Sequence, residues 1–454
     1  MKITFAKLGI NGEGIGYTEE KKPVFCSGVY PGDTALVKII EEHDHYAKAQ
    51  LTKILDYSKE RVRSACPHDR RCQACPLLRM DYKAQLKYKK QMLDEALWKY
   101  GRVSDKLIRD MHESPLTSGY RNQLKLPVRE YDGVLKTGMY LQGTNHFVET
   151  DGCLMHDPEM EKVRGEVMKL VNAYEIKAYD TRSMKGLRYL ILRGIDHQFM
   201  VCFITGRDEL SEGFINAVSA IDGMTTVSQS INTDKKANTF FGSKVKVLKG
   251  EEHMTVHLKD IDLQLSPDSF FQLNKPQAER LYELAIQKID PCDSLVEAYC
   301  GVGAMSIMAA DKAKSVIGIE SVEAAVNNAE ANALLNHVDD HVRFLCKDAS
   351  EGMQYVLSRK NVDVLLADPP RSGMDEAMIN TILSSSIRKI VYISCNPATL
   401  GKNIKDLKKE YDVRTVIPFD MFPGTPHIES ITVLERRGMK MPRVEKKKRI
   451  RNKH

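Results

Sequence analysis

The feature that most constrains the fold is a regular alternation of short apolar segments and longer helical segments that begins near residue 266. The apolar segments are rich in Val, Ile and Leu, which is typical of strands buried on both faces of a sheet. Helices are expected between them, for example over 322–335 and 375–384. This pattern predicts an α/β domain with a parallel sheet over 266–435. The expected strands are 294–298, 315–319, 342–345, 362–367, 389–394 and 431–434.

The remaining residues divide into three further regions. A chain of 454 residues is too long for one ordinary domain, and about two to four are expected. Residues 1–58 contain short alternating runs separated by Gly and Pro, which predicts a small OB-like β-barrel. Residues 59–265 combine a cysteine-rich segment, an amphipathic helix near 80–100 and several strands, which predicts a mixed α+β central domain. Residues 436–454 form a basic tail.

The positive charge of the chain is concentrated in that tail. The formal net charge is +6, but the tail alone holds ten Lys and Arg against one Glu. The first 435 residues therefore have a net charge of −3. A basic tail can bind phosphates by releasing counterions, and a purely solubilising tail is the alternative.

The cellular compartment is expected to be the cytoplasm. No run of residues approaches the ~18 apolar residues of a membrane helix, and the first residues lack the apolar core of a signal peptide. Ten cysteines in such a chain argue against a disulfide framework, because the cytoplasm keeps thiols reduced. We expect no membrane association and no obligate protein partner.

The carboxyl ends of the expected strands hold residues suited to a nucleoside cofactor, since open α/β sheets bind ligands at that edge. The first strand leads into Tyr299-Cys-Gly301, and the second ends in Glu320, which can accept hydrogen bonds from ribose hydroxyls. Asp348 follows the third strand and is a candidate for an adenine contact. The fourth ends in Asp368-Pro-Pro-Arg, where two prolines stiffen the loop. Such loops favour S-adenosylmethionine over NAD; an ordinary strand-end cap is the alternative for each residue alone.

The fifth strand ends at a candidate nucleophile, Cys395. Asn396 and Pro397 favour the start of a helix there, and the helix dipole is expected to lower the pKa of the thiol. A thiolate can add to carbon 6 of a uracil and so make carbon 5 nucleophilic. A general base must later remove the carbon-5 proton, and Glu429 is the candidate, although spacing alone does not rank it far above Glu297. A buried structural cysteine and a surface carboxylate are the alternatives.

Four cysteines form a candidate metal site. Cys66, Cys72 and Cys75 lie on one short segment, and Cys153 is the available fourth ligand. Thiolate sets of this kind bind zinc or an iron–sulfur cluster, and the spacing by itself favours zinc.

The ordered motifs of the chain resemble those of the RNA uracil-5-methyltransferase family. The residues that resemble it are Ser266-Pro-Asp-Ser-Phe-Phe-Gln272-Leu-Asn, Tyr299-Cys-Gly301, Asp368-Pro-Pro-Arg371, Ser394-Cys395-Asn-Pro and His427-Ile-Glu429. The N-terminal region is similar to the TRAM domain, an RNA-binding barrel, through Gly14-Ile-Gly, Val24-Phe, Pro31-Gly-Asp and Ala47-Lys-Ala. One departure is Ala304, where some relatives have a polar residue.

The resemblance implies a class I, Rossmann-like methyltransferase domain and a role for each motif. It implies that Gln272, Tyr299, Glu320 and Asp368 bind S-adenosylmethionine, that Cys395 is the nucleophile and that Glu429 is the base. The long first gap of the cysteine set and its distant fourth member are similar to the branch with a [4Fe-4S] cluster and a TRAM domain. That branch acts mostly on 23S ribosomal RNA, so the expected partner is that RNA.

Three other functions were considered. Relatives that modify tRNA have the same chemistry. An amino-methyltransferase would also use an Asp-Pro-Pro loop, but it leaves Cys395 and Glu429 without a role. A non-catalytic RNA-binding or ribosome-assembly factor would need only the barrel, the cysteine cluster and the tail.

Overall fold

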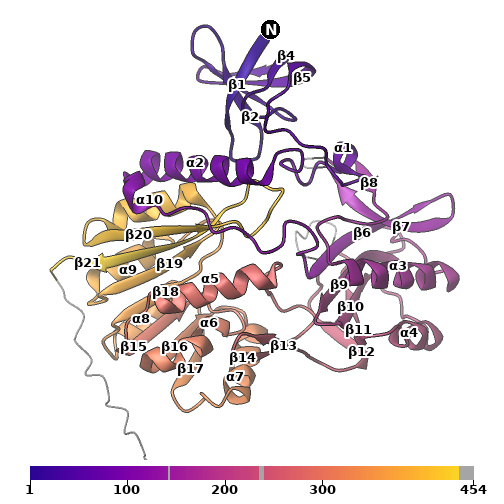
Figure 1. Ribbon diagram of the computed structural model, residues 1–454. Helices are drawn as coiled ribbons and strands as arrows, with labels where there is room; N and C mark the ends of the chain where they lie inside the picture. Colours follow the sequence, from indigo (N-terminus) through magenta and orange to yellow (C-terminus); the bar gives the residue numbers. More distant parts are fainter. Residues whose placement is uncertain (142–143, 235–239, 439–454) are drawn as a thin grey trace, which may run out of the picture.

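The computed structural model describes residues 1–141, 144–234 and 240–438. The strands form a closed five-stranded barrel, two seven-stranded sheets and a separate hairpin. Figure 1 shows the barrel above the long helix α2, with the central sheet on the right and the C-terminal sheet below. The expected barrel and the expected α/β domain are both confirmed.

The barrel closes in the order β1-β2-β3-β5-β4, around a small core that includes Phe5, Val24 and Val37. Its strands alternate buried and exposed residues, which is the pattern of a sheet with one wet face. Gly16 is required by packing, because a Cβ there would lie 2.3 Å from Cγ2 of Ile3. The strands are β1 (Lys2–Leu8), β2 (Gly14–Tyr17), β3 (Pro23–Cys26), β4 (Thr34–Glu42) and β5 (Ala47–Asp56).

Helix α2 (Tyr82–Gly101) packs on the C-terminal domain rather than on the central sheet. It begins at Asp81, whose side chain accepts hydrogen bonds from two backbone N–H groups of the first turn. Close approach to helix α10 (Pro397–Leu407) depends on a glycine pair, since a Cβ on Gly101 would lie 2.9 Å from the carbonyl oxygen of Gly401. Short helices α1 (Asp69–Cys72) and η1 (Asp105–Leu107) lie on either side of α2 in sequence.

The central domain has a seven-stranded sheet in the order β12-β11-β10-β9-β6-β7-β8. It also contains helices, which agrees with the expected mixed α+β domain. Helices α3 (Pro158–Ala173) and α4 (Glu212–Ser219) cover one face of it and share a hydrophobic core with it. The strands are β6 (Gln123–Tyr131), β7 (Val134–Tyr140), β8 (Phe147–Glu149), β9 (Leu187–Ile195), β10 (Gln198–Thr205), β11 (Met224–Ile231) and β12 (Val245–Gly250).

The C-terminal sheet has the order β17-β16-β15-β18-β19-β21-β20. Its first five strands pair in parallel, and β21 runs antiparallel to both of its neighbours, β19 and β20. All six expected strands are present; β20 was not expected. The strands are β15 (Cys292–Ala298), β16 (Ala313–Glu320), β17 (Val342–Cys346), β18 (Val364–Ala367), β19 (Lys389–Ser394), β20 (Tyr411–Phe419) and β21 (Glu429–Arg436). The helices are α5 (Lys275–Gln287), α6 (Ala304–Met308), η2 (Ala310–Lys312), α7 (Glu323–Leu335), α8 (Ala349–Leu357), α9 (Glu376–Ser384) and α10.

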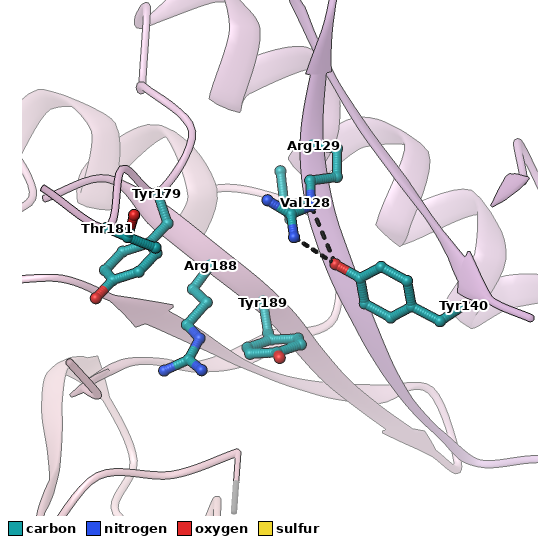
Figure 2. A pocket seen from close by; sticks show the side chains of 7 residues that line it. All are labelled: Val128, Arg129, Tyr140, Tyr179, Thr181, Arg188 and Tyr189. Atoms are coloured by element: carbon teal, nitrogen blue, oxygen red, sulfur yellow. Dashed lines mark hydrogen bonds between the residues drawn. The ribbon is translucent and has the colours of Figure 1, made fainter. Parts of the chain in front are cut away.

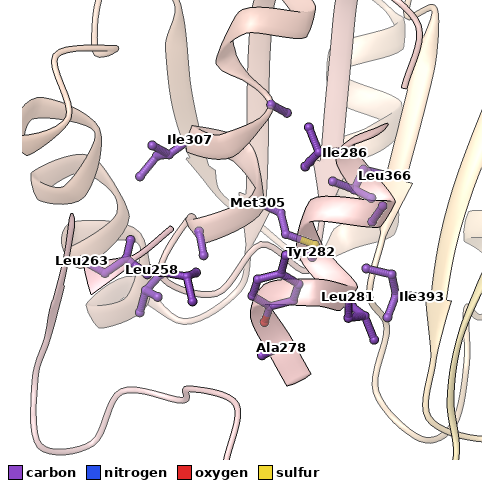
Figure 3. Close-up of a cluster of buried hydrophobic side chains, with 14 of the residues drawn as sticks. Leu258, Leu263, Ala278, Leu281, Tyr282, Ile286, Met305, Ile307, Leu366 and Ile393 are labelled. Carbon is purple, nitrogen blue, oxygen red and sulfur yellow. The ribbon is translucent and has the colours of Figure 1, made fainter. Parts of the chain in front are cut away.

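Apolar cores lie on both faces of this sheet. Figure 3 shows one of them, in which Leu281 and Tyr282 of α5 lie beside Leu366 of β18 and Ile393 of β19. The hairpin β13 (Met254–Leu258) and β14 (Ile261–Leu265) joins this core. It is tied to α7, because the Gln264 N–H donates to Oδ1 of Asn332 at 2.7 Å.

The end of β21 overlaps the region expected to be a basic tail. Arg436 is buried, and its guanidinium donates to the carbonyl oxygens of Ile382 and Ile387. It also donates to the Tyr411 hydroxyl at 2.8 Å. Arg436 is therefore part of the sheet's packing, while residues 439–454 of the expected tail lie outside the described residues. Among the helices that the structure describes, none has the length and apolar character needed to cross a membrane.

Candidate active site

The carboxyl ends of β15, β16, β18 and β19 lie along one edge of the C-terminal sheet. Parallel pairing aligns Ala298 with both Ile319 and Ala367, and aligns Ala367 with Tyr392. The residues that follow these strands therefore lie side by side, at the edge where such sheets bind ligands.

The loop after β15 has an unusual backbone. Its φ angles are +65° at Tyr299, +53° at Gly301 and +83° at Gly303. A Cβ at Gly303 would lie 2.7 Å from Cζ of Phe344, whereas a Cβ at Gly301 would meet nothing within 4 Å. A left-handed tyrosine costs about 1–3 kcal/mol, and such strain is concentrated at functional sites. The loop therefore leaves open space beside Gly301 at the sheet edge.

Glu320 and Asp348 both occupy strand ends but have different surroundings. Oε2 of Glu320 accepts from the Gly301 N–H at 3.1 Å, and Oε1 accepts from the Ser321 and Val322 N–H groups. The Glu320 carboxylate is thus fixed against the glycine loop. Asp348 is exposed, and its Oδ1 caps α8 by accepting from the Ser350 N–H at 2.9 Å. That carboxylate has a structural role, and its contact with adenine stays a prediction.

Gln272 and Asp368 lie near one buried tyrosine. The Gln272 side chain hydrogen-bonds to the Tyr282 hydroxyl, and burial together with the Asp368 carboxylate raises the pKa of Tyr282. Burial also raises the pKa of Asp368 to about 7. The loop that holds Gln272 is anchored to the central domain, since Asn122 Nδ2 donates to the Gln272 carbonyl oxygen at 2.9 Å.

Glu297 is a further candidate that the sequence alone did not rank. It lies inside β15 and is 1% exposed. The Ser306 hydroxyl donates to its Oε2, while its Oε1 has no hydrogen-bond partner among the described residues. Burial, with a contribution from Asp368, raises the pKa of Glu297 to about 8. An unsatisfied buried carboxylate oxygen calls for a donor such as a cofactor ammonium. The signal in the sequence was an acidic residue within an apolar strand.

Cys395 and Glu429 face each other at the end of two antiparallel strands. Ser394 of β19 pairs with Ser430 of β21, so the next residues outward are Cys395 and Glu429. Residues opposite each other in antiparallel strands have Cα atoms about 4.5–5.5 Å apart. The structure therefore brings the expected nucleophile and the expected base together, 34 residues apart in the chain.

The pKa expected for Cys395 was wrong in direction. Burial and the Glu429 and Asp368 carboxylates raise the pKa of the Cys395 thiol to about 11, and the Arg371 cation opposes them. Burial and Asp368 likewise raise the pKa of Glu429 well above its usual value. Lost hydration is the largest cause of the raised pKa of Cys395, and the two neighbouring carboxylates add to it.

A cleft of about 440 Å³ leads to Cys395 from the surface. It is lined by the β1–β2 turn of the barrel, by α2 and by the strand ends, so three parts of the chain enclose it. Arg371 and His427 form one wall, with Nη2 of Arg371 at 3.3 Å from both ring nitrogens of His427. Burial and the Arg371 cation lower the pKa of His427 to about 4, so its imidazole is neutral at pH 7. The cleft gives a substrate base a route to the thiol.

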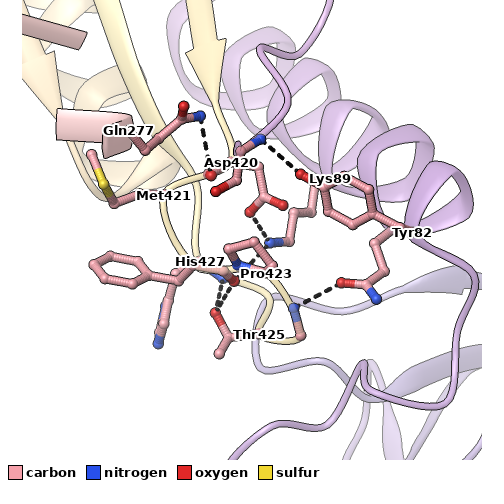
Figure 4. A network of polar contacts seen from close by, with 12 residues as sticks. Tyr82, Lys89, Gln277, Asp420, Met421, Pro423, Thr425 and His427 are labelled. Atoms are coloured by element: carbon pink, nitrogen blue, oxygen red, sulfur yellow. Dashed lines mark hydrogen bonds and ion pairs between the residues drawn. The ribbon is translucent and has the colours of Figure 1, made fainter. Parts of the chain in front are cut away.

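The loop before Glu429 is held by a buried ion pair, shown in Figure 4. Nζ of Lys89 lies 2.6 Å from Oδ1 of Asp420, and both side chains are fully buried. Lys89 also donates to the Phe422 carbonyl oxygen at 3.1 Å. Helix α2 therefore fixes the segment from which His427 and Glu429 project.

The four expected metal ligands gather at a separate cavity. Cys66, Cys72, Cys75 and Cys153 all line it, together with Arg121. Each of the other three thiols acts electrostatically on the pKa of Cys75, which burial raises to about 12. Within the described ranges, however, no group of three or more His, Cys, Asp or Glu residues is arranged to hold a metal ion. The structure brings the cysteines together without showing a metal centre.

The cysteine segment connects three parts of the molecule. The Tyr30 hydroxyl of the barrel donates to the Pro76 carbonyl oxygen at 2.7 Å. The Leu77 N–H donates to the carbonyl oxygen of Gly424, in the loop that precedes Glu429, at 2.9 Å. His68 contacts Asp151 of the central domain at 2.7 Å. The segment is therefore in direct contact with the barrel, the central domain and the loop that precedes Glu429.

Comparison with known sequences identifies the family. The sequence profile named tRNA (uracil-5-)-methyltransferase matches residues 81–437, and the TRAM domain profile matches residues 1–52. The chain belongs to the tRNA (uracil-5-)-methyltransferase family. It has an N-terminal TRAM domain in addition, which agrees with the closed barrel.

Individual relatives agree with this family. The chain is 33% identical over 445 residues to an uncharacterised RNA methyltransferase of Halalkalibacterium halodurans, covering 96% of both chains. It is 34% identical over 446 residues to one of Caldanaerobacter subterraneus, covering 96% of this chain and 98% of the relative. The crystal structure of the Pyrococcus abyssi tRNA (uracil-54, C5)-methyltransferase with S-adenosyl-L-homocysteine is similar, with a TM-score of 0.77 and 25% identity. The match covers 96% of this chain and all of that one.

Proposed function

We propose that this protein methylates carbon 5 of a uridine in RNA, with S-adenosylmethionine as methyl donor and Cys395 as nucleophile. The observation that supports this most is the pairing of β19 with β21, which sets Cys395 opposite Glu429 at the end of a cleft. The family and the TRAM barrel support an RNA substrate.

Each step uses a group at this edge of the sheet. The Cys395 thiolate adds to carbon 6 of the uracil, and the electrons of the 5,6 double bond pass to the ring carbonyl as an enolate. When bound, S-adenosylmethionine would supply an electrophilic methyl group to carbon 5, with S-adenosylhomocysteine as the leaving group that keeps the electron pair of the broken sulfur–methyl bond. The Glu429 carboxylate removes the proton from carbon 5, and the electrons of that C–H bond restore the double bond and expel the thiolate.

The cofactor site fits S-adenosylmethionine by the chemistry of its residues. Gln272, Glu297 and Asp368 lie near the buried Tyr282 hydroxyl, and Glu320 fixes the loop at Tyr299–Gly303. The unsatisfied oxygen of Glu297 suits an ammonium group. Asp368 would hold the methionine end, and Glu320 the ribose hydroxyls.

Glu429→Gln tests the proposed chemistry. Without a base at that position, we expect the methylated adduct with ordinary uridine RNA to persist, and turnover to fall by about 10²–10⁴-fold. Denaturing gel electrophoresis with a radioactive methyl group should show label in a protein–RNA band. Glu435→Gln on the same strand, where Glu435 pairs with exposed Arg414, is the control. Wild-type turnover by Glu429→Gln would contradict the proposal.

The pH dependence of adduct formation should report the Cys395 thiol. Because the pKa of Cys395 is raised to about 11, the thiolate fraction increases with pH through neutrality. We expect the rate of adduct formation with 5-fluorouridine RNA to rise about tenfold per pH unit between roughly pH 7 and 9. Arg371→Gln removes a cation that lowers this pKa, so the rate at pH 8 should fall and the profile should shift to higher pH. Arg359→Gln, on an exposed arginine after α8, should leave the profile unchanged.

We propose 23S ribosomal RNA as the substrate, because the TRAM barrel and the four-cysteine set occur together. A tRNA substrate is the second candidate, favoured by the family name and by the similarity to the Pyrococcus enzyme. Mapping 5-methyluridine in 23S RNA and in tRNA, from cells with and without the gene, separates the two. Loss of the modification from tRNA alone would overturn the first.

We also propose that Cys66, Cys72, Cys75 and Cys153 hold a [4Fe-4S] cluster, with zinc as the alternative. Four thiolates with a metal or cluster form an anionic group. The buried cation Arg121 lies in the same cavity, and its Nε has no hydrogen-bond partner in the part of the chain that the structure describes. Uracil methylation needs no net electron transfer, so the group would stabilise the segment that contacts the barrel and the catalytic loop.

The metal content of protein purified without oxygen distinguishes the two alternatives. We expect about four iron atoms per chain for the cluster, or one zinc atom, and loss of the metal in Cys75→Ser. Cys346→Ser, which changes an exposed cysteine, is the control and should keep the metal. Wild-type protein with neither metal would contradict the site.

A further inference from the structure

One face of the central sheet presents tyrosines and cations instead of a covering helix. Helices α3 and α4 pack on the other face, where the large core of this domain lies. The opposite face has a small buried apolar cluster of Ile191, Cys202 and Ile204, against which Phe240 and Phe241 pack. Next to it are Arg129, Tyr140, Tyr179, Arg188 and Tyr189, which we call the tyrosine–arginine surface.

Figure 2 shows Arg129, Tyr140, Arg188 and Tyr189 on strands of the sheet and Tyr179 on the segment before β9. The guanidinium of Arg188 lies 5.4 Å from the ring centroids of both Tyr179 and Tyr189. Nη2 of Arg129 donates to the Tyr140 hydroxyl at 2.7 Å. Nη1 of Arg188 donates to the Asp234 carbonyl oxygen at 2.9 Å. The planar groups are therefore held in place.

The surface is hollowed by a cavity of about 240 Å³. That is below the usual ~300–1,000 Å³ of small-molecule sites, so it has room for one planar base rather than a large ligand. Its lining alternates aromatic rings with guanidinium groups. Rings of this kind stack on nucleobases, and arginines bind the adjoining phosphates.

The charge of the neighbourhood also suits a polyanion. Nζ of Lys125, on β6, lies 5.5 Å from the Phe240 ring, and Phe240 itself packs edge-on against Tyr189 at 5.1 Å. The nearby Asp180 carboxylate is engaged in its own turn, where it accepts from the Arg182 and Ser183 N–H groups.

Strand β9 connects this surface to the loop that holds Gln272. Side chains alternate along a strand, so Tyr189, Ile191 and Arg193 lie on one face, about 13 Å from first to last. The Arg193 guanidinium donates to the Ser269 carbonyl oxygen, in the loop that holds Gln272. Phe270 of that loop is 72% exposed. Ile191 and Arg193 are buried, so β9 links the surface to that loop through the protein interior.

We propose that the tyrosine–arginine surface binds an unpaired nucleotide of the RNA substrate, with its base stacked on tyrosine and its phosphate held by arginine. This inference rests on the proposed function for the existence of an RNA substrate. It adds a second contact, outside both the barrel and the Cys395 cleft, that selects single-stranded over duplex RNA.

The test compares RNA binding by two matched double variants of the full chain. Arg129→Gln/Tyr179→Leu changes the surface, and Lys169→Gln/Tyr174→Leu likewise removes one cation and one tyrosine ring on the helix-covered side. The probes are a fluorescein-labelled 12-nucleotide oligouridylate and an RNA duplex of equal length. We expect the first variant to lose about tenfold or more in oligouridylate affinity and less in duplex affinity, and the second to match wild type.

Two further variants separate stacking from structural damage. Arg129→Gln/Tyr179→Phe keeps the ring at position 179, so its oligouridylate affinity should equal that of Arg129→Gln alone. Arg129→Gln alone should reduce the slope of log affinity against log salt by about 0.7, the value for one phosphate contact on a single strand. Unchanged oligouridylate affinity in the double variant, or equal loss in the control variant, would overturn the inference.

Failure of the proposed function is distinguishable from failure of this inference. With saturating 5-fluorouridine-substituted ribosomal RNA, every variant that retains Cys395 should form the covalent adduct. Absence of the adduct in wild type would remove the proposed chemistry. Presence of the adduct together with unchanged oligouridylate binding by Arg129→Gln/Tyr179→Leu would remove only the tyrosine–arginine surface.

Discussion

Cys395→Ala is expected to abolish methylation and the covalent adduct with 5-fluorouridine RNA. Fluorine cannot leave carbon 5 as a proton does, so wild-type protein should remain attached to that RNA through Cys395. The variant has no sulfur to add to carbon 6, and loss of a nucleophile lowers turnover by about 10³-fold or more. A denaturing gel for the adduct and methyl incorporation into RNA measure the two effects.

Binding and fold should survive this change. Cys395 lies beyond the end of β19, and alanine there removes one partly exposed sulfur. Calorimetry should therefore give unchanged affinity for S-adenosylmethionine, and Cys346→Ala should behave as wild type in every assay. Methylation by Cys395→Ala at the wild-type rate would instead support an amino-methyltransferase.

Lys89→Met is expected to destabilise the protein by about 3–5 kcal/mol, because it leaves the Asp420 carboxylate buried without its cation. The corresponding fall in melting temperature is roughly 10 °C. Turnover should fall as well, since Lys89 holds the loop from which Glu429 projects. Urea unfolding followed by circular dichroism measures the loss of stability.

Lys90→Met is the matched control on the neighbouring residue. Lys90 pairs with Asp94 one turn along α2, at a partly exposed position, and such pairs contribute less than about 1 kcal/mol. Replacing both buried partners, as in Lys89→Met/Asp420→Leu, should recover much of the stability. A Lys89→Met protein as stable as Lys90→Met would show that the ion pair does not hold the loop.

The sequence determined the kinds of element and most of the site. Continuous apolar runs between helical segments indicate strands that are buried on both faces of a sheet. The strands that lead to Tyr299, Glu320, Asp368 and Cys395 could therefore be expected in order. The β20 strand was missed because Pro418 interrupts its apolar run, and a proline argues against a strand unless the strand lies at a sheet edge. Its place at the edge depends on pairing with β21.

Only the tertiary structure decided which groups meet and how they titrate. Helix α2 and the β13–β14 hairpin lie in sequence within the expected central region, yet their apolar faces complete the C-terminal cores. The pKa of Cys395 is raised first by burial and then by the Glu429 and Asp368 carboxylates, which approach it from other strands. Local sequence specifies periodicity and chain reversal, whereas desolvation and charge proximity depend on contacts between residues far apart in the chain.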